Sequence, residues 1–125
     1  MKRIIETKSA PAPIGPYSQA VLHNGTLFMS GQIAIDPTNG EYHPSDATTE
    51  TKQVMKNIEA VLLEAGMSFS NVLKTSIFLK DMNDFAAVNE EYAKYFTADF
   101  PARETVQVSV LPKNARVEIS MIAAL

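Results

Sequence analysis

The sequence of 125 residues contains no cysteine and only two histidines. Without cysteine there can be no disulfide framework, no thiolate nucleophile and no thiolate metal site. His23 and His43 fall in predicted turn or loop segments and lack the carboxylates and second histidine that a zinc site needs. Phosphate-binding loops, glycine-rich dinucleotide turns and Gly-x-Ser-x-Gly elbows are also missing. We therefore expect no bound metal.

Basic runs and long apolar runs are missing as well. The 11 lysines and arginines are dispersed along a chain of formal net charge −3, which argues against nucleic acid as the main partner. No apolar stretch approaches the length of a membrane span. Residues 1–13 carry Lys2, Arg3, Glu6 and Lys8 where a secretory signal has an apolar segment. We expect a soluble cytoplasmic protein with no membrane partner.

What the chain does have is the composition of one globular domain over residues 1–125, with 46% hydrophobic and 20% charged residues. Residues 18–22 and 26–35 are predicted to be strands, and Asn24-Gly25 between them predicts a tight hairpin. Turn formers and polar residues fill positions 36–46, which are predicted to form a loop.

Two helices are predicted. From about residue 48 to residue 65, apolar side chains recur at helical spacing, and Gly66 follows where a C-terminal cap glycine belongs. Asn83 can cap a second helix, which Pro101 prevents from continuing. The apolar face of this second helix consists of Phe85, Val88, Tyr92, Tyr95 and Phe96.

The remaining segments predict strands. Residues 72–80 alternate between polar and apolar side chains, and the last third does so again. The alternating apolar positions there are Val106, Val108 and Val110 in one strand and Val117, Ile119, Met121 and Ala123 in the next. The order of elements predicts an α+β two-layer sandwich, with two helices on one face of a mixed sheet. Because a small domain cannot cover the other face, we expect subunits to associate.

Two charged residues are candidates for chemistry. Arg103 stands at the mouth of a strand just after Pro101, where a guanidinium can grip a carboxylate or phosphate through two hydrogen bonds. On position alone, the commoner role would be a surface ion pair with Glu104 or Glu91. Glu118 lies on a strand face that also carries apolar side chains, so it is either a solvated residue or a positioned acid or base.

Two further residues have both a functional and a structural explanation. Tyr17 follows the stiff turn Ile14-Gly15-Pro16, which fixes the direction of its phenol, although ordinary core packing is the simpler explanation. Gly31 interrupts an apolar strand where a ligand or another backbone segment could come close, or where the strand has a bulge.

Six short segments together carry a family resemblance that none of them carries alone. They are Ala12-Pro13-Ile14-Gly15-Pro16-Tyr17-Ser18-Gln19, Ser30-Gly31-Gln32-Ile33, Asp84-Phe85-Ala86-Ala87-Val88-Asn89, Phe100-Pro101-Ala102-Arg103, Leu111-Pro112-Lys113 and Val117-Glu118-Ile119. In this order and spacing they resemble the Rid family, also called YjgF or reactive intermediate deaminases, over nearly the whole chain. The Pro-Ala-Arg segment resembles the RidA branch, whose members hydrolyse 2-imino acids.

The resemblance implies hydrolysis of 2-iminopropanoate, 2-iminobutanoate or similar imino acids to 2-keto acids and ammonia, which removes reactive enamines and imines and requires no cofactor. Arg103 would hold the substrate carboxylate and orient the imine carbon. Glu118 would position or deprotonate the attacking water. Further substrate contacts would come from Tyr17, Gly31, Asn89 and the backbone of Thr105.

The resemblance also implies a chorismate-mutase-like fold with a six-stranded sheet. Three such chains would form a homotrimer with a central barrel of sheets and active sites between subunits. Thr105 and Ser120 depart from the family, whose members often have cysteine and an acidic residue there. Glu104 would compete with substrate if it folded back onto Arg103, but strand alternation should point it the other way.

Two other functions stay open. The arginine pocket could bind a 2-keto acid or a similar carboxylate without turnover, with the trimer acting on a regulatory partner. An RNA-directed role is known for some relatives, but the acidic charge balance counts against it.

Overall fold

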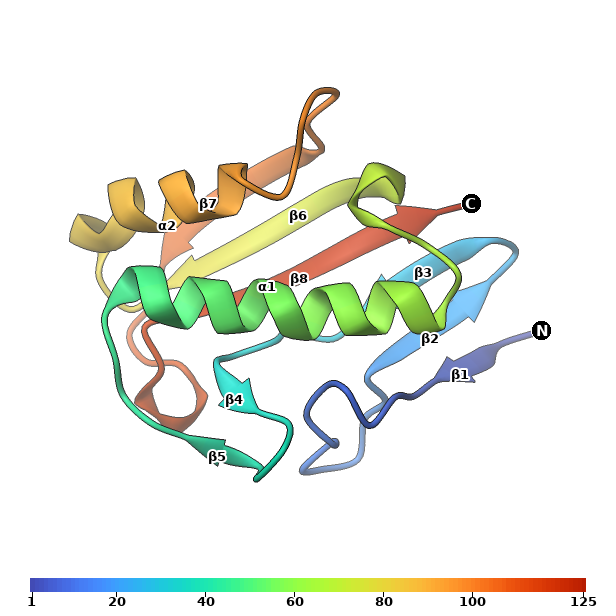
Figure 1. Ribbon diagram of the computed structural model, residues 1–125, viewed down its shortest axis with the longest axis horizontal. Coiled ribbons are helices and arrows are strands. Elements are labelled where there is room, and N and C mark those ends of the chain that lie inside the picture. Colours follow the sequence, from blue (N-terminus) through green and yellow to red (C-terminus); the bar gives the residue numbers. More distant parts are fainter.

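The computed structural model describes all residues, Met1–Leu125. Two helices lie across one face of a six-stranded sheet whose strand order is β1-β2-β3-β8-β6-β7 (Figure 1). The strands are β1 Arg3–Ile5, β2 Ala20–His23, β3 Thr26–Met29, β6 Val72–Leu79, β7 Ala102–Gln107 and β8 Val117–Ala124. The predicted α+β architecture of two helices on a mixed six-stranded sheet is confirmed.

One strand pair gives the sheet its mixed character. Neighbouring strands are antiparallel except β6 and β7, which are parallel. Because β7 pairs only with β6, it forms one edge of the sheet. The connection that returns the chain from β6 to the parallel β7 contains the second helix, as a parallel crossover requires.

Helix α1, Ala47–Glu64, confirms the first predicted helix and begins one residue before the expected start. Asp46 caps it by accepting a hydrogen bond from the Thr49 N–H at 2.7 Å. The apolar stripe of α1 is fully buried against the sheet. Gly66 ends the helix with φ +75°, a conformation in which a side chain would be strained.

Helix α2, Phe85–Ala93, is shorter than its predicted apolar face. Asn83 does not cap it, so that prediction is wrong: the Asn83 N–H instead donates to the side chain of Asp81, which caps the short 3-10 turn Met82–Asp84. Of the expected face, Phe85 is exposed, whereas Val88 and Tyr92 are buried. Tyr95 and Phe96 follow the helix and still pack against the core.

The predicted strand over residues 26–35 is wrong in length, because β3 ends at Met29. The chain leaves β8 there and touches it again only at Gln32, through a single bridge to Ile119. It then forms a separate hairpin of β4, Ile35–Asp36, and β5, Glu41–Tyr42. Between Phe28 and Gln32, no strand residue is paired with this edge of β8.

The last predicted strands are partly correct. β7 ends at Gln107, so Val108 and Val110 lie outside it, and Val110 is largely exposed. β8 follows the predicted alternation, with Val117, Ile119, Met121 and Ala123 buried. β1 was not predicted, because a strand of three residues is too short to show a periodic pattern.

The two faces of the sheet differ in cover. On the face beneath α1 and α2, Thr75, Leu79 and Ile119 have no exposed surface. On the opposite face, Phe28 and Val106 remain 49% and 42% exposed. No helix is long and apolar enough to cross a membrane.

Candidate functional site

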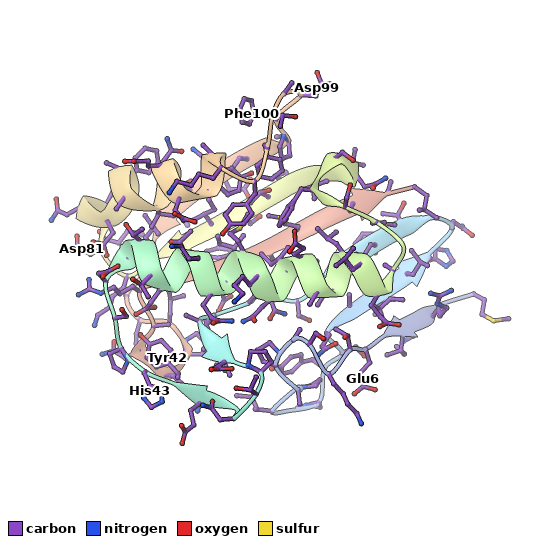
Figure 2. The ribbon with its side chains drawn as sticks, viewed as in Figure 1. Glu6, Tyr42, His43, Asp81, Asp99 and Phe100 are labelled. Carbon is purple, nitrogen blue, oxygen red and sulfur yellow. The ribbon has the colours of Figure 1, made fainter.

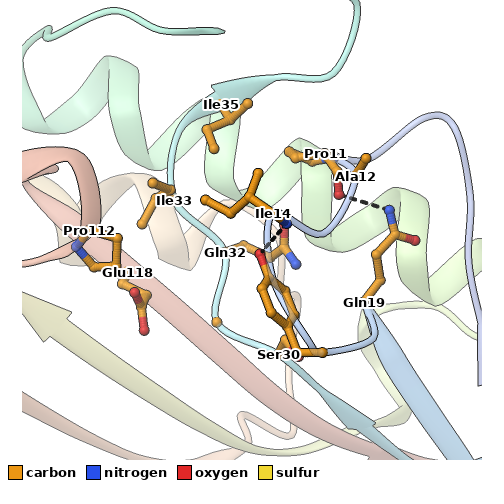
Figure 3. Close-up of a pocket in the computed structure, with 12 residues that line it drawn as sticks. Pro11, Ala12, Ile14, Gln19, Ser30, Gln32, Ile33, Ile35, Pro112 and Glu118 are labelled. Carbon is orange, nitrogen blue, oxygen red and sulfur yellow. Dashed lines mark hydrogen bonds between the residues drawn. The ribbon is translucent and has the colours of Figure 1, made fainter. Parts of the chain in front are cut away.

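A pocket of about 360 Å³ opens beside β8, at the point where β3 has turned away from it (Figure 3). Glu118 extends from β8 next to Pro112 on one side, and the segment that contains Pro11, Ala12 and Ile14 lies on the other side. The remaining lining residues are Tyr17, Gln19, Ser30, Gly31, Gln32, Ile33 and Ile35. The pocket is therefore an apolar recess with one carboxylate.

Gly31 lies against the carboxylate of Glu118. A Cβ atom at position 31 would collide with the Glu118 side chain, so the glycine makes room for this carboxylate. Within one subunit, burial alone raises the pKa of Glu118 above its usual value, because neither a cation nor a hydrogen-bond donor of the same chain compensates for the lost water. A carboxylate with a raised pKa and free acceptor atoms is suited to take a proton from water.

Tyr17 lies at the rim of the same pocket. Its side chain is about half exposed, so the explanation by ordinary core packing is wrong. The Ile14 N–H donates to the Tyr17 hydroxyl at 3.3 Å, and the Tyr17 N–H donates to the Gly15 carbonyl at 2.8 Å. The turn thus fixes the phenol, as the sequence predicted.

Arg103 lies in β7 beneath α2, outside this pocket. Its Nη1 donates to the Asn89 side-chain oxygen at 2.8 Å. The guanidinium carbon is 5.1 Å from the ring centre of Tyr92 and 5.8 Å from that of Phe85. One amide and two aromatic rings therefore orient the guanidinium.

No carboxylate of the chain pairs with Arg103, so the surface ion pair considered for it is wrong. Glu91 instead accepts hydrogen bonds from Lys94 and Tyr95. Glu104 pairs with Lys74 at 3.0 Å on the opposite face of the sheet and contacts the Ser76 hydroxyl. The expectation that Glu104 points away from Arg103 is confirmed, and the guanidinium is free to take an external anion.

The backbone at the edge of β7 also faces outward. The Val108 N–H donates to the Leu79 carbonyl at 2.9 Å, so the even-numbered positions of β7 turn their backbone groups toward β6. Alternation then turns the N–H and C=O groups of Arg103 and Thr105 toward the free edge. The Thr105 hydroxyl is buried and has no hydrogen-bond partner.

A second pocket of about 350 Å³ covers this edge. It is lined by Asn89, Tyr92, Ala93, Phe100, Pro101 and Arg103. Phe100 is 63% exposed and lies with Asp99 in the loop that projects beyond the sheet between α2 and β7 (Figure 2). The pocket thus combines a cation, an amide and aromatic walls.

The structure places the predicted residues in two groups that do not meet. Tyr17, Gly31 and Glu118 form the first group, and Asn89, Arg103 and Thr105 form the second. Arg103 lies in register with Thr75 and Met121, whose side chains are buried on the helix-covered face. Glu118 lies in register with Phe78 and points to the opposite face.

Several pocket residues were not proposed from the sequence. Ile35, Pro11 and Pro112 line the Glu118 pocket, and Tyr92 and Phe85 flank Arg103. Phe85 and Pro112 belong to segments that carried the family resemblance, which was the available signal. No group of three or more histidine or acidic side chains comes together as a metal site.

The chain is similar in sequence and structure to several known proteins. A family model described as Endoribonuclease L-PSP matches residues 7–125. The 2-iminobutanoate/2-iminopropanoate deaminase of Capra hircus is 50% identical over 98% of this chain and 90% of that protein. A Rid family protein of unknown function from Yersinia pestis has a TM-score of 0.97 and 52% identity, with both chains covered completely. Escherichia coli TdcF with bound serine has a TM-score of 0.94 and 40% identity over 98% of each chain.

Proposed function

The chain belongs to the endoribonuclease L-PSP family, also called Rid or YjgF, and from this membership we propose that it is a 2-iminobutanoate/2-iminopropanoate deaminase. It hydrolyses a small 2-imino acid to the 2-keto acid and ammonia. Curated relatives with this activity are close to half identical over nearly the whole chain. Loss of the reactive imine is the useful outcome of the reaction.

The observation that carries this proposal is the unpaired guanidinium of Arg103. It has no carboxylate partner, and Asn89 and Tyr92 orient it. A planar fork of N–H donors matches a planar carboxylate, and the outward N–H groups of Arg103 and Thr105 add donors at the same edge. The structure of TdcF contains bound serine, a small molecule with a carboxylate, and this supports the proposal.

Glu118 supplies the base. It takes a proton from a water whose oxygen attacks the imine carbon, and the π electrons of the C=N bond move to nitrogen, which receives that proton from Glu118 to give the carbinolamine. Glu118 then takes the proton of the carbinolamine hydroxyl, and as the C=O bond forms the C–N bond breaks and the nitrogen leaves as ammonia with this second proton, again returned by Glu118. Atoms balance with one water per imine, and no cofactor takes part.

Both groups of residues can meet only if the site is shared between subunits, because Arg103 and Glu118 lie on opposite faces of one sheet. We propose a homotrimer in which Arg103 of one subunit faces the Glu118 pocket of the next. The uncovered face of the sheet, with Phe28 and Val106 exposed, supports burial against other subunits in a central barrel. A head-to-tail contact of this kind closes into a ring when the rotation between neighbouring subunits closes, as the proposed trimer requires.

Complementation tests the reaction and the shared site together. Arg103→Ala and Glu118→Gln each inactivate every site of their own homotrimers. When the two variants are mixed, unfolded and refolded, about one quarter of the subunit contacts combine an intact Arg103 with an intact Glu118. A coupled amino acid dehydratase assay should then recover about one quarter of the wild-type rate of imine loss.

The outcomes are distinct. Recovery of activity supports a deaminase with shared sites. If the wild type accelerates imine loss but the mixture stays inactive, the site lies within one subunit. A wild type that binds 2-ketobutyrate without accelerating imine loss would instead be a non-catalytic carboxylate-binding protein.

A further inference from the structure

Two walls of the Glu118 pocket have irregular backbone. Residues 7–17 contain no strand or helix, and residues 33–35 run from just after the Gln32 bridge to the first residue of β4, which pairs only with the short β5. Backbone N–H and C=O groups that are removed from water need partners, and these segments lie outside the six-stranded sheet that would supply them. In each wall, one buried side-chain amide supplies several of these partners.

Gln19 holds the first wall. It is 2% exposed and lies just before β2. Its Oε1 accepts from the Thr7 N–H at 2.7 Å. Its Nε2 donates to the carbonyls of Thr7, Ala10 and Pro11 at 3.0, 3.3 and 2.9 Å. The bond to Pro11 is drawn in Figure 3, where the wall passes over the pocket.

The backbone of Gln19 is tied to the other side of the same pocket. Its carbonyl accepts from the Ser30 N–H at 2.9 Å, next to the glycine that lies against Glu118. Gln19 therefore connects the 7–17 wall to the segment beside the catalytic carboxylate.

Asn57 holds the second wall from within α1. It is 1% exposed, and its Nδ2 donates to the carbonyls of Ile33 and Ile35 at 3.3 and 2.9 Å. Gln53 donates to the Asn57 Oδ1 at 2.9 Å, which fixes the orientation of the amide. The side chains of Ile33 and Ile35 line the pocket, so Asn57 fixes the part of the second wall that they form.

We propose that Gln19 and Asn57 are positioning residues of the deamination reaction, which hold the apolar walls at a fixed distance from Glu118 and so select the size of the substrate side chain. Neither residue touches the reacting atoms. This inference rests on the proposed function. It assigns to the two amides an effect on substrate binding that is separate from their contribution to folding.

The expected effect follows from the direction of the hydrogen bonds. Each amide nitrogen donates to two or three carbonyl oxygens. A carboxylate in its place would present oxygen to oxygen and push the wall away. Glu118 itself is fixed by β8, so turnover of bound substrate should change little, while contacts with the aliphatic part of the substrate weaken.

The variants Gln19→Glu and Asn57→Asp test this proposal, with Asn71→Asp as the matched control. Asn71 is also an amide that ties loop backbone to a strand, since it donates to the Ala124 carbonyl at 3.0 Å and accepts from the Ser68 N–H at 2.9 Å. It does not line the pocket. Each protein is assayed as a folded oligomer with 2-iminopropanoate and 2-iminobutanoate produced by a coupled dehydratase.

We expect KM to rise about 10-fold in Gln19→Glu and Asn57→Asp while kcat stays within about 3-fold, and the ratio of kcat/KM between the two substrates to move toward one. Asn71→Asp should lose thermal stability without a change in KM or in this ratio. Equal stability losses in all three variants, with unchanged KM and ratio, would show that the amides are only structural and overturn the proposal.

Two further measurements apply if a variant does not fold or if the wild type has no deaminase activity. If Gln19→Glu does not fold, the apolar isostere Gln19→Met replaces it, and hydrogen exchange of the wild type is compared with and without 2-ketobutyrate. Slower exchange in residues 7–17 but not in residues 68–71 supports the proposal, and no slowing in residues 7–17 overturns it. If the wild type shows no deaminase activity, the proposed function fails; calorimetry with 2-ketobutyrate then decides the positioning role alone, since a dissociation constant unchanged in both variants would refute it.

Discussion

The two faces of the sheet bury their residues by different means and, in the proposed reaction, carry different parts of the chemistry. The face beneath α1 and α2 is closed by the chain itself, and its β6 and β8 residues have almost no exposed surface. Arg103 stands at the edge of this face, where α2 supplies Asn89 and Tyr92. The opposite face is left half exposed, and Glu118 projects from it into a pocket made by irregular segments.

In the proposed reaction, this difference assigns substrate binding to one face and proton transfer to the other. The helix-covered side fixes a cation through aromatic and amide contacts, which suits recognition of a carboxylate. The open side leaves a carboxylate without partners, which suits a base. Neither face carries a complete site. A substitution on the Arg103 side should therefore impair mainly substrate binding, and one on the Glu118 side mainly proton transfer.

The largest effect is expected from Arg103. Arg103→Ala should lower kcat/KM about 10³-fold, because the substrate carboxylate loses the guanidinium that binds it. Arg103→Lys keeps the charge but not the planar fork, and should still lose most of the activity. Calorimetry with 2-ketobutyrate should show weaker binding in both variants. Full turnover in Arg103→Ala would end the deaminase assignment.

Glu118→Gln should act on turnover and not on binding. Loss of a general base lowers kcat by about 10²-fold or more, while 2-ketobutyrate should bind almost as tightly as to the wild type. Measuring kcat and the affinity for 2-ketobutyrate together distinguishes the two residues, because the Arg103 variants should alter both quantities and Glu118→Gln only kcat. An active Glu118→Gln beside an inactive Arg103→Ala would mean that another group, such as backbone near Thr105, positions the water.

The raised pKa of Glu118 also predicts that the Glu118→Gln variant is more stable than the wild type near neutral pH. The folded protein holds this proton to a higher pH than the unfolded chain does, so ionisation above the raised pKa costs the folded state free energy. Glu118→Gln removes that cost and should raise Tm by about 1–3 °C at pH 7.5. Thermal scans should show the gain disappear below pH 4.5, the ordinary glutamate value, where both states are protonated. A gain that persists there would come from packing instead.

The smallest effect is expected from Glu104, the neighbour of Arg103 on the same strand. Glu104→Gln removes a carboxylate that faces Lys74 and Ser76, away from the guanidinium. The affinity for 2-ketobutyrate should stay within about 2-fold of the wild type, because exposed ion pairs contribute little. Tighter binding in this variant would mean that Glu104 swings over to compete with the substrate.

Periodic segments of this fold could be predicted from the sequence, and short ones could not. The stripe of α1 and the alternation of β8 gave the correct elements because burial repeats along them. β1 and the β4–β5 hairpin are too short to show a period. Asn83 failed as a cap because it lies inside the 3-10 turn Met82–Asp84, which precedes the helix and is itself capped by Asp81.

The site shows a similar division. Arg103, Glu118 and Gly31 could be found because each is unusual for its place in the sequence. That Arg103 and Glu118 lie on opposite faces depends on the crossover between β6 and β7, which no local pattern encodes. Gln19 resembles any polar residue beside a strand, whereas Asn57 left a signal, a polar side chain on the buried stripe of a helix.

The free edge of β7 has a consequence for how the protein avoids aggregation. Unpaired N–H and C=O groups along a sheet edge invite another strand to add to them, and charged side chains in the edge strand discourage it. In β7, that charge comes from Arg103 and Glu104, so the side chain that we propose binds the substrate also discourages the addition of another strand. An apolar substitution at position 103 would make the β7 edge more prone to pair with a strand of another chain, and it would also remove the cation of the proposed binding site. Such a substitution would therefore be expected to lower solubility as well as the proposed activity.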